Sequence, residues 1–130
     1  MSVYAVTNPA SGEQVKTFST FTDNELDSAI ALAYDAYQSW LRSSTVEERV
    51  KLVRRVGELH SERREQLAEI ATREMGKPLE QALGEVDFCV DIYGFYADNG
   101  PELMKDEPIE LLSGEGSAII RRSPYGVILG

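Results

Sequence analysis

The chain has 130 residues and a formal net charge of −9, from 13 basic and 22 acidic side chains. This length allows one domain of ordinary size, and 42% hydrophobic with 27% charged residues is typical of a globular protein. The acidic balance argues against binding to nucleic acid or an anionic membrane, because both require clustered Lys and Arg. No apolar run approaches about 18 residues. The single cysteine rules out an internal disulfide, so we expect a reducing, cytoplasmic setting.

Turn-forming residues near the N-terminus predict a β-hairpin. The run Asn-Pro-Ala-Ser-Gly at residues 8–12 lies between strand formers, which places the hairpin over residues 4–18. A capping box follows, in which the Thr22 hydroxyl accepts from the Glu25 amide and the Glu25 side chain reaches back. Apolar residues spaced three and four apart continue to Trp40, so an amphipathic helix is expected there.

A second capping box, joining Thr45 to Glu48, starts the next helical region. Apolar residues at helical spacing continue as far as Ala71. A single helix of roughly thirty residues would be long for a small domain, so a break near Ser61 is favoured. The run Met-Gly-Lys-Pro at residues 75–78 then predicts a stop, with Gly as a left-handed cap and Pro opening the next helix.

The last helix is expected from Pro78 to about Ala97, ended by Asn-Gly-Pro at residues 99–101. The helical region as a whole then spans residues 22–99. Gly84 lies inside this helix at a cost of up to about 1 kcal/mol relative to Ala, which predicts close packing at that position.

The character of the sequence changes after the helices. Short extended runs around a Gly-Glu-Gly turn predict a second hairpin within residues 109–123. The apolar, β-prone triplet within residues 126–130 is typical of the start of a buried strand.

Candidate nucleophiles and metal ligands are few. Cys89 lies on an apolar helix face with acidic neighbours in sequence, so a structural thiol is favoured over a nucleophile. His60 is the only histidine, and no Cys or second His stands at zinc-ligand spacing. Contact of His60 with carbonyls near a helix end is therefore favoured. The acidic positions Glu80, Glu85 and Asp87 are expected to form a solvated helix face rather than an acid–base pair.

Three other patterns are assigned ordinary structural roles. Gly-Glu-Gly at residues 114–116 lacks the further Gly and the Lys-Ser/Thr of a phosphate loop, so a hairpin turn is favoured. Aromatic residues at helical spacing are expected in a core or an interface; they are Tyr37, Trp40, Tyr93, Phe95 and Tyr96. Basic residues interleaved with glutamates predict a salt-bridged helix surface; they are Arg49, Lys51, Arg54, Arg55, Arg63 and Arg64. No catalytic, cofactor-binding or metal-binding residue is assigned.

The order of several motifs resembles the N-terminal part of aldehyde dehydrogenases. Asn-Pro-Ala-Ser-Gly-Glu at residues 8–13 resembles their hairpin turn, and Glu-Met-Gly-Lys-Pro at residues 74–78 resembles their helix-ending E-x-G-K-P signature. Residues 93–98 resemble the aromatic end of the next helix, and residues 121–130 resemble the R-x-x-P-x-G-V entry to the cofactor domain. Met-Gly-Lys-Pro and Ala-Asp-Asn-Gly-Pro are most similar to the succinate-semialdehyde dehydrogenase-like branch.

The resemblance implies an α/β, aldehyde dehydrogenase-like fold for the full enzyme. This chain would be its mainly helical N-terminal portion, with an N-terminal β-hairpin and short C-terminal strands. Such enzymes oxidise an aldehyde to its acid with NAD or NADP, through a thiohemiacetal on a cysteine. The segments that carry this cysteine, the assisting glutamate and the cofactor contacts would lie beyond Gly130. We therefore expect no catalysis and no cofactor binding by this chain alone, and Cys89 is not the family's nucleophile.

By the same resemblance, residues 109–123 are oligomerisation-type strands and residues 126–130 start the cofactor-domain sheet. The helix near Glu85 and Phe88 lies beside the substrate entrance, with no role assigned to either residue. The expected partners are the remainder of the enzyme, further copies in a dimer or tetramer, and a small aldehyde such as succinate semialdehyde. The alternative is a stand-alone, non-catalytic helical interaction module.

Overall fold

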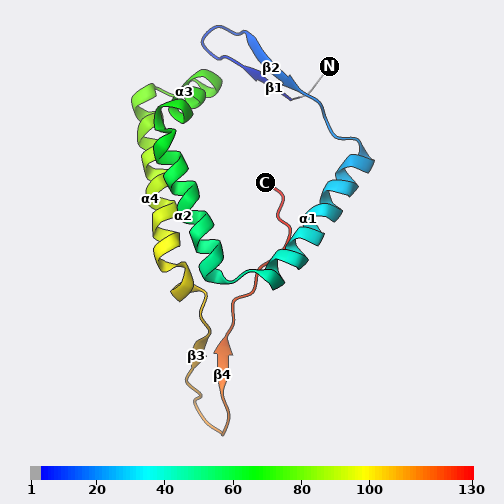
Figure 1. Cartoon of the computed structure of the whole chain (residues 1–130), viewed down its shortest axis with the longest axis vertical. Helices are drawn as coiled ribbons and strands as arrows, with labels where there is room; N and C mark the ends of the chain where they lie inside the picture. The colour runs from blue at the N-terminus through cyan, green and yellow to red at the C-terminus, as the bar shows by residue number, and fades with distance from the viewer. Residues whose placement is uncertain (1–3) are drawn as a thin grey trace.

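The computed structural model describes residues 4–130, which form a hairpin, a series of helices and a second hairpin (Figure 1). Strand β1 (Tyr4–Thr7) pairs antiparallel with β2 (Gln14–Phe18), as the turn residues predict. Between the strands, the Gly12 amide donates to the Asn8 carbonyl at 2.8 Å, and Gly12 has a φ of 74°. Gly tolerates this left-handed conformation because it lacks a Cβ, which lets the chain reverse here.

Helices α1 (Asp23–Ser43) and α2 (Val46–Glu62) both begin at the predicted capping boxes. The Thr22 amide donates to the Glu25 carboxylate at 2.8 Å, and the Glu25 amide donates back to the Thr22 hydroxyl at 3.3 Å. The bond from the Thr22 amide, with a second from the Thr22 hydroxyl to the same carboxylate at 2.9 Å, lowers the pKa of Glu25. Helix α2 carries the same pair of bonds at its own N-terminus.

Helix α3 (Arg64–Met75) follows a break at Arg63, close to the expected position. Gly76 ends α3 with a φ of 73°, and its amide donates to the Thr72 carbonyl. The left-handed glycine cap predicted at this stop is therefore present.

Helix α4 (Leu79–Leu103) is longer than expected, because the Asn-Gly-Pro run does not end it. Pro101 lies inside the last turn, and the helical region extends beyond residue 99 to Leu103. A proline ring usually clashes with the Cβ of the preceding residue when that residue is helical. Here the preceding residue is Gly100, which has no Cβ. A proline near a helix end also removes only one hydrogen bond, and the Met104 amide still bonds the Gly100 carbonyl at 3.0 Å.

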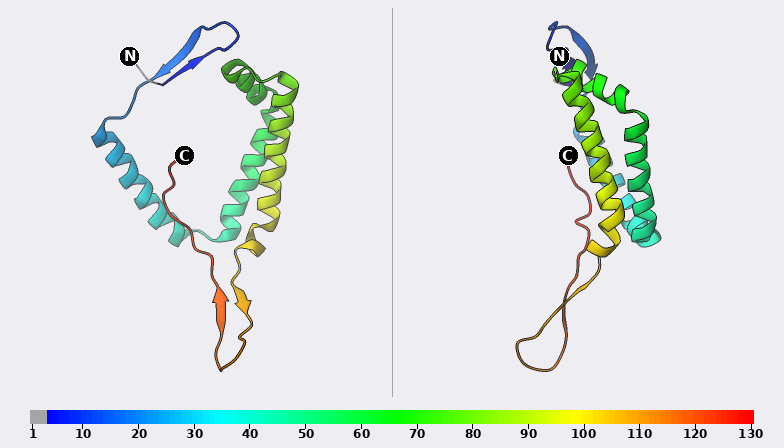
Figure 2. Two further views of the ribbon diagram at one scale, coloured as in Figure 1. Left: turned by 180° about the vertical axis from the view of Figure 1, so that it is seen from behind. Right: turned by 90° about the vertical axis from the view of Figure 1, so that its left-hand side faces the viewer.

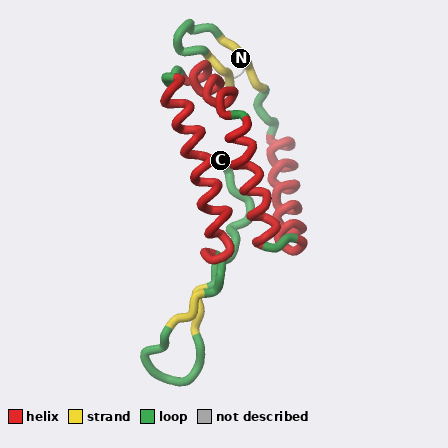
Figure 3. Tube along the Cα trace, turned by 60° about the vertical axis from the view of Figure 1, so that its left-hand side comes forward, coloured by secondary structure: helices red, strands yellow, loops and turns green. Residues whose placement is uncertain are grey.

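Helices α2, α3 and α4 pack together (Figure 3), whereas α1 stands apart from them (Figure 2, left). The small core joins α3 to α4 through Ala68, Ala82 and Val86. Helices α2 and α4 approach closely at Gly57, where an added Cβ would lie 3.1 Å from the Tyr93 Cβ. The close packing predicted at Gly84 is wrong, since an added Cβ there would meet nothing within 4 Å.

The second hairpin projects beyond the helices (Figure 1). Strand β3 (Glu107–Ile109) pairs antiparallel with β4 (Ala118–Ile120), so the first strand lies slightly earlier than the sequence indicated. Residues 121–130 form neither helix nor strand, and Ile128 and Leu129 are 77% and 95% exposed. A strand requires a hydrogen-bonded neighbour, and no described segment pairs with these residues.

None of the helices within residues 4–130 is both long enough and apolar enough to cross a lipid bilayer.

Candidate functional site

The three acidic residues predicted to form a solvated face of α4 are all exposed, and two of them, Glu85 and Asp87, also form ion pairs. Asp87 accepts two bonds from the Arg64 guanidinium, at 2.5 Å from Nε and 2.7 Å from Nη2. This pairing lowers the pKa of Asp87 and raises that of Arg64. Glu85 pairs with Lys77, which lies in the loop before α4. The two pairs join α4 to α3 and to the loop before α4. Helical spacing alone did not reveal these contacts.

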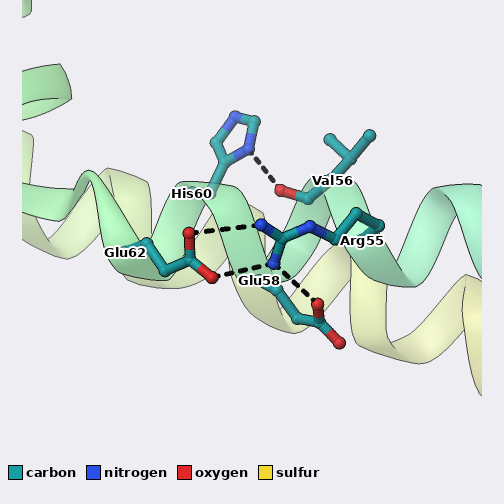
Figure 4. Close-up of polar contacts among 5 residues, drawn as sticks. All are labelled: Arg55, Val56, Glu58, His60 and Glu62. Carbon is teal, nitrogen blue, oxygen red and sulfur yellow. Dashed lines mark hydrogen bonds and ion pairs between the residues drawn. The ribbon is translucent and has the colours of Figure 1, made fainter.

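His60 contacts a helix carbonyl, as the sequence predicts. Its Nδ1 lies 2.9 Å from the Val56 carbonyl oxygen (Figure 4). Its ring also packs against Tyr93 of α4, with 4.9 Å between ring centroids. These two contacts place His60 in the interface between α2 and α4.

Three of the six basic residues predicted to form a salt-bridged surface, Arg54, Arg55 and Arg64, form ion pairs with carboxylates. Arg55 Nη1 donates to Glu58 at 2.9 Å and to Glu62 at 2.8 Å (Figure 4). The bond from Arg55 lowers the pKa of Glu62. Arg54 reaches across to Asp98 of α4 at 2.6 Å. Arg49, Lys51 and Arg63 form no ion pair among residues 4–130, so the prediction holds for part of this surface.

Cys89 is a free, half-buried thiol on α4. Residues 4–130 contain no group of three or more His, Cys, Asp and Glu side chains that could hold a metal ion. The absence of a catalytic or metal-binding role in this chain stays a prediction.

The aromatic residues lie in three separate places and do not form one stacking site. Tyr93 packs on His60, while Phe95 and Tyr96 meet edge to face at 5.3 Å between centroids. Phe95 and Tyr96 border an open hollow of about 510 Å³ on α4, together with Phe88, Asp91 and Ile92. Tyr37 and Trp40 lie on α1 and line a different hollow.

That second hollow is an apolar groove between α1 and the C-terminal segment, and we call it the α1 groove. It has a volume of about 590 Å³. Gly126 approaches Tyr37 so closely that an added Cβ would lie 3.4 Å from its ring. The lining residues are Ala33, Ala36, Tyr37, Trp40, Leu41, Arg49, Met104, Pro124, Gly126, Val127 and Ile128. Sequence reasoning missed the groove because its two walls lie far apart in the chain; the apolar stripe of α1 was its only signal.

The arrangement of these elements matches a known enzyme class. The model of the aldehyde dehydrogenase family matches residues 2–130, and the chain belongs to this family. Its helices and hairpins are a mainly helical fragment of the aldehyde dehydrogenase fold, as the sequence motifs indicated.

The similar proteins include several succinate-semialdehyde dehydrogenases. The NADP+ enzyme of Deinococcus radiodurans is 39% identical over 127 residues, which cover 98% of this chain and 26% of the relative. The NAD(P)+ enzyme of Escherichia coli is 34% identical over 122 residues, which cover 94% of this chain and 26% of the relative. A succinic semialdehyde dehydrogenase of Streptococcus pyogenes, solved with NADP+, has a TM-score of 0.80 and 35% identity. The superposition covers 86% of this chain and 25% of that one.

This chain therefore spans about a quarter of the length of the curated relatives that it matches.

Proposed function

We propose that these residues are the N-terminal portion of an NADP-dependent succinate-semialdehyde dehydrogenase, which oxidises this aldehyde to its acid. The carrying observation is the 39% identity to the D. radiodurans enzyme over nearly the whole chain. The fold match to the S. pyogenes enzyme with NADP+ supports the same reading. The preference for NADP over NAD rests on the names of these relatives, and the E. coli enzyme is named for both cofactors.

Within that enzyme, the described elements would surround the cofactor domain rather than hold the cofactor. We infer that residues 109–123 are the oligomerisation-type strands of a dimer or tetramer. Strands β3 and β4 support this, since they form an exposed two-stranded hairpin with free edges. We also infer that residues 126–130 begin the cofactor-domain sheet, since an apolar triplet with no strand partner is suited to join one.

The chain alone would not catalyse the reaction. The His60 ring lies against Tyr93 and a helix carbonyl, and the carboxylates Glu85 and Asp87 are engaged in ion pairs. None of these groups hydrogen-bonds the Cys89 thiol, a contact that activation of a nucleophile by a base requires. The alternative, a stand-alone interaction module, is not supported by the comparisons.

The test is an activity measurement on the longer polypeptide that contains these residues. Purified enzyme is mixed with succinate semialdehyde and either NADP+ or NAD+, and the absorbance of the reduced cofactor is followed. We expect faster reduction with NADP+, and no turnover by residues 1–130 alone. Turnover by the short chain that disappears in a Cys89→Ser variant would contradict the proposal, and so would a complete enzyme inactive towards this aldehyde.

A further inference from the structure

Arg49, unlike Arg54, Arg55 and Arg64, has no acidic partner among residues 4–130. Its Nη1 donates to the carbonyl and the hydroxyl of Ser44, both at 2.9 Å. None of the ion pairs within residues 4–130 includes Arg49, although Arg54, Arg55 and Arg64 each have a carboxylate. The N–H groups on Nε and Nη2 are therefore left for another acceptor.

Among the described residues, Arg49 is also the only charged one that lines the α1 groove. The other lining residues are apolar, aromatic or glycine, and Arg49 itself is half-buried. The chain carries a net charge of −9, so an unpaired cation in an apolar hollow is a local exception. Its guanidinium has the planar fork that binds a carboxylate through two parallel bonds.

Covering the groove with purely apolar material would bury this cation without a counter-charge, and an unpaired buried charge is strongly destabilising. An occupant that supplies a carboxylate at Arg49 would avoid this cost. The same occupant needs apolar side chains for the surface around Trp40, which is 51% exposed, and Met104, which is 41% exposed.

The occupant is best explained as a polypeptide rather than a small molecule. The groove is open, and its apolar surface continues into Ile128 and Leu129, which are still more exposed than Trp40. The relatives carry about three quarters of their length outside the matched region, which supplies ample chain to cover this face.

We propose that the α1 groove seats an apolar segment from the remainder of the enzyme, and that a carboxylate of this segment pairs with Arg49. The proposal rests on the proposed function, because only a longer aldehyde dehydrogenase provides that remainder. Arg49 is then a positioning residue that selects an acidic, apolar segment for this face of α1.

Hydroxyl-radical labelling of the longer enzyme, read by mass spectrometry, tests whether the groove is covered. Trp40 and Met104 should be labelled several-fold less in the folded enzyme than in its urea-unfolded state. Leu52, which is exposed on α2 outside the groove, serves as the internal control. Labelling of Trp40 and Met104 as strong as in the unfolded state would overturn the proposal. This readout is independent of activity, so it separates failure of the groove assignment from failure of the proposed function.

Variants of the longer enzyme test the carboxylate. Arg49→Gln removes the charge and should lower Tm and raise the labelling of Trp40, whereas Arg49→Lys keeps the charge but not the two parallel bonds and should retain part of the protection. Arg42→Gln is the matched control, because Arg42 bonds only the Gln38 side chain and lies outside the groove. Ser44→Ala removes the hydroxyl that Arg49 bonds but leaves the charge of Arg49 in place, so it measures the effect of that hydrogen bond alone. If Trp40 is as well protected in the Arg49→Gln variant as in the parent, no carboxylate pairs with Arg49.

Discussion

Gly57 of α2 lies directly against Tyr93 of α4, and a Cβ on Gly57 would be 3.1 Å from the Tyr93 Cβ. Such a contact is closer than ordinary van der Waals packing, so the missing side chain sets the distance between the two helices. The His60 ring packs on the same tyrosine, 4.9 Å away between centroids. Tyr93 is thus held between two residues of α2 that lie one helical turn apart.

A larger residue at Gly57 should separate α2 from α4. We expect Gly57→Val to reduce the free energy of unfolding by about 1–3 kcal/mol through overpacking. Gly84→Ala is the control on α4, where a Cβ meets nothing within 4 Å. It should stabilise the chain by up to about 1 kcal/mol, because Ala is the better helix former. Urea unfolding of the longer enzyme, followed by circular dichroism, measures both, and a Gly57→Val variant as stable as the parent would contradict the packing described.

Gly76 should be intolerant of a side chain for two separate reasons. Its φ is 73°, and an added Cβ would lie 2.9 Å from the Pro9 Cγ of the N-terminal hairpin. Gly12 shares the positive φ but has open space around it, so Gly12→Ala measures the backbone cost alone. That cost is roughly 1–2 kcal/mol for an L-residue in the left-handed conformation.

We expect Gly76→Ala to lower the free energy of unfolding by more than Gly12→Ala. Adding Pro9→Ala to the Gly76→Ala variant should recover part of the difference, because it removes the atom that clashes. Thermal unfolding of the single and double variants measures these effects. Equal losses for Gly76→Ala and Gly12→Ala would show that the hairpin turn does not press on the end of α3.

The ion pair of Asp87 with Arg64 should make stability depend on acid pH. The pairing lowers the pKa of Asp87 from its ordinary value of 3.8. Folding therefore favours the ionised carboxylate, and the stabilisation is present above pH 3.8 and lost as pH falls through the lowered pKa.

Asp87→Asn should be less stable than the parent at neutral pH. The difference in the free energy of unfolding should shrink as the solution is acidified below about pH 4. Asp91→Asn is the control, since Asp91 lies on the same helix and makes no ion pair within residues 4–130. Urea midpoints measured from neutral pH down to strongly acidic conditions test this. A constant gap between parent and Asp87→Asn across that range would contradict the assigned role.

Residues 1–130 in isolation should expose an apolar surface that promotes self-association. The buried hydrophobic side chains among residues 4–130 are only Ala68, Ala82, Val86 and Ala97. Contiguous exposed apolar surface normally marks an interface, so we expect ANS binding and self-association of the short chain. ANS fluorescence and light scattering measure these properties. A monodisperse monomer that melts cooperatively without an ANS signal would instead favour the stand-alone module.

The sequence by itself determined the local elements and the family. The capping boxes at Thr22 and Thr45 and the stop at Gly76 rest on hydrogen bonds between residues a few positions apart. The spacing of side chains encodes such bonds directly. The order of short motifs along the chain indicated the aldehyde dehydrogenase family, because their spacing is carried by the sequence itself.

The tertiary structure decided which residues meet across elements. Gly57 and Gly84 look alike as helical glycines, yet only Gly57 lies where two helices cross. The pairing of Asp87 with Arg64 and the placing of Arg49 in the α1 groove likewise join residues far apart in the chain. Helix crossing and chain direction fix these contacts, and helical periodicity specifies only which face a residue occupies. The continuation of α4 through Pro101 shows the same limit locally, since a proline does not by itself end a helix where the preceding Gly100 has no Cβ to clash with its ring.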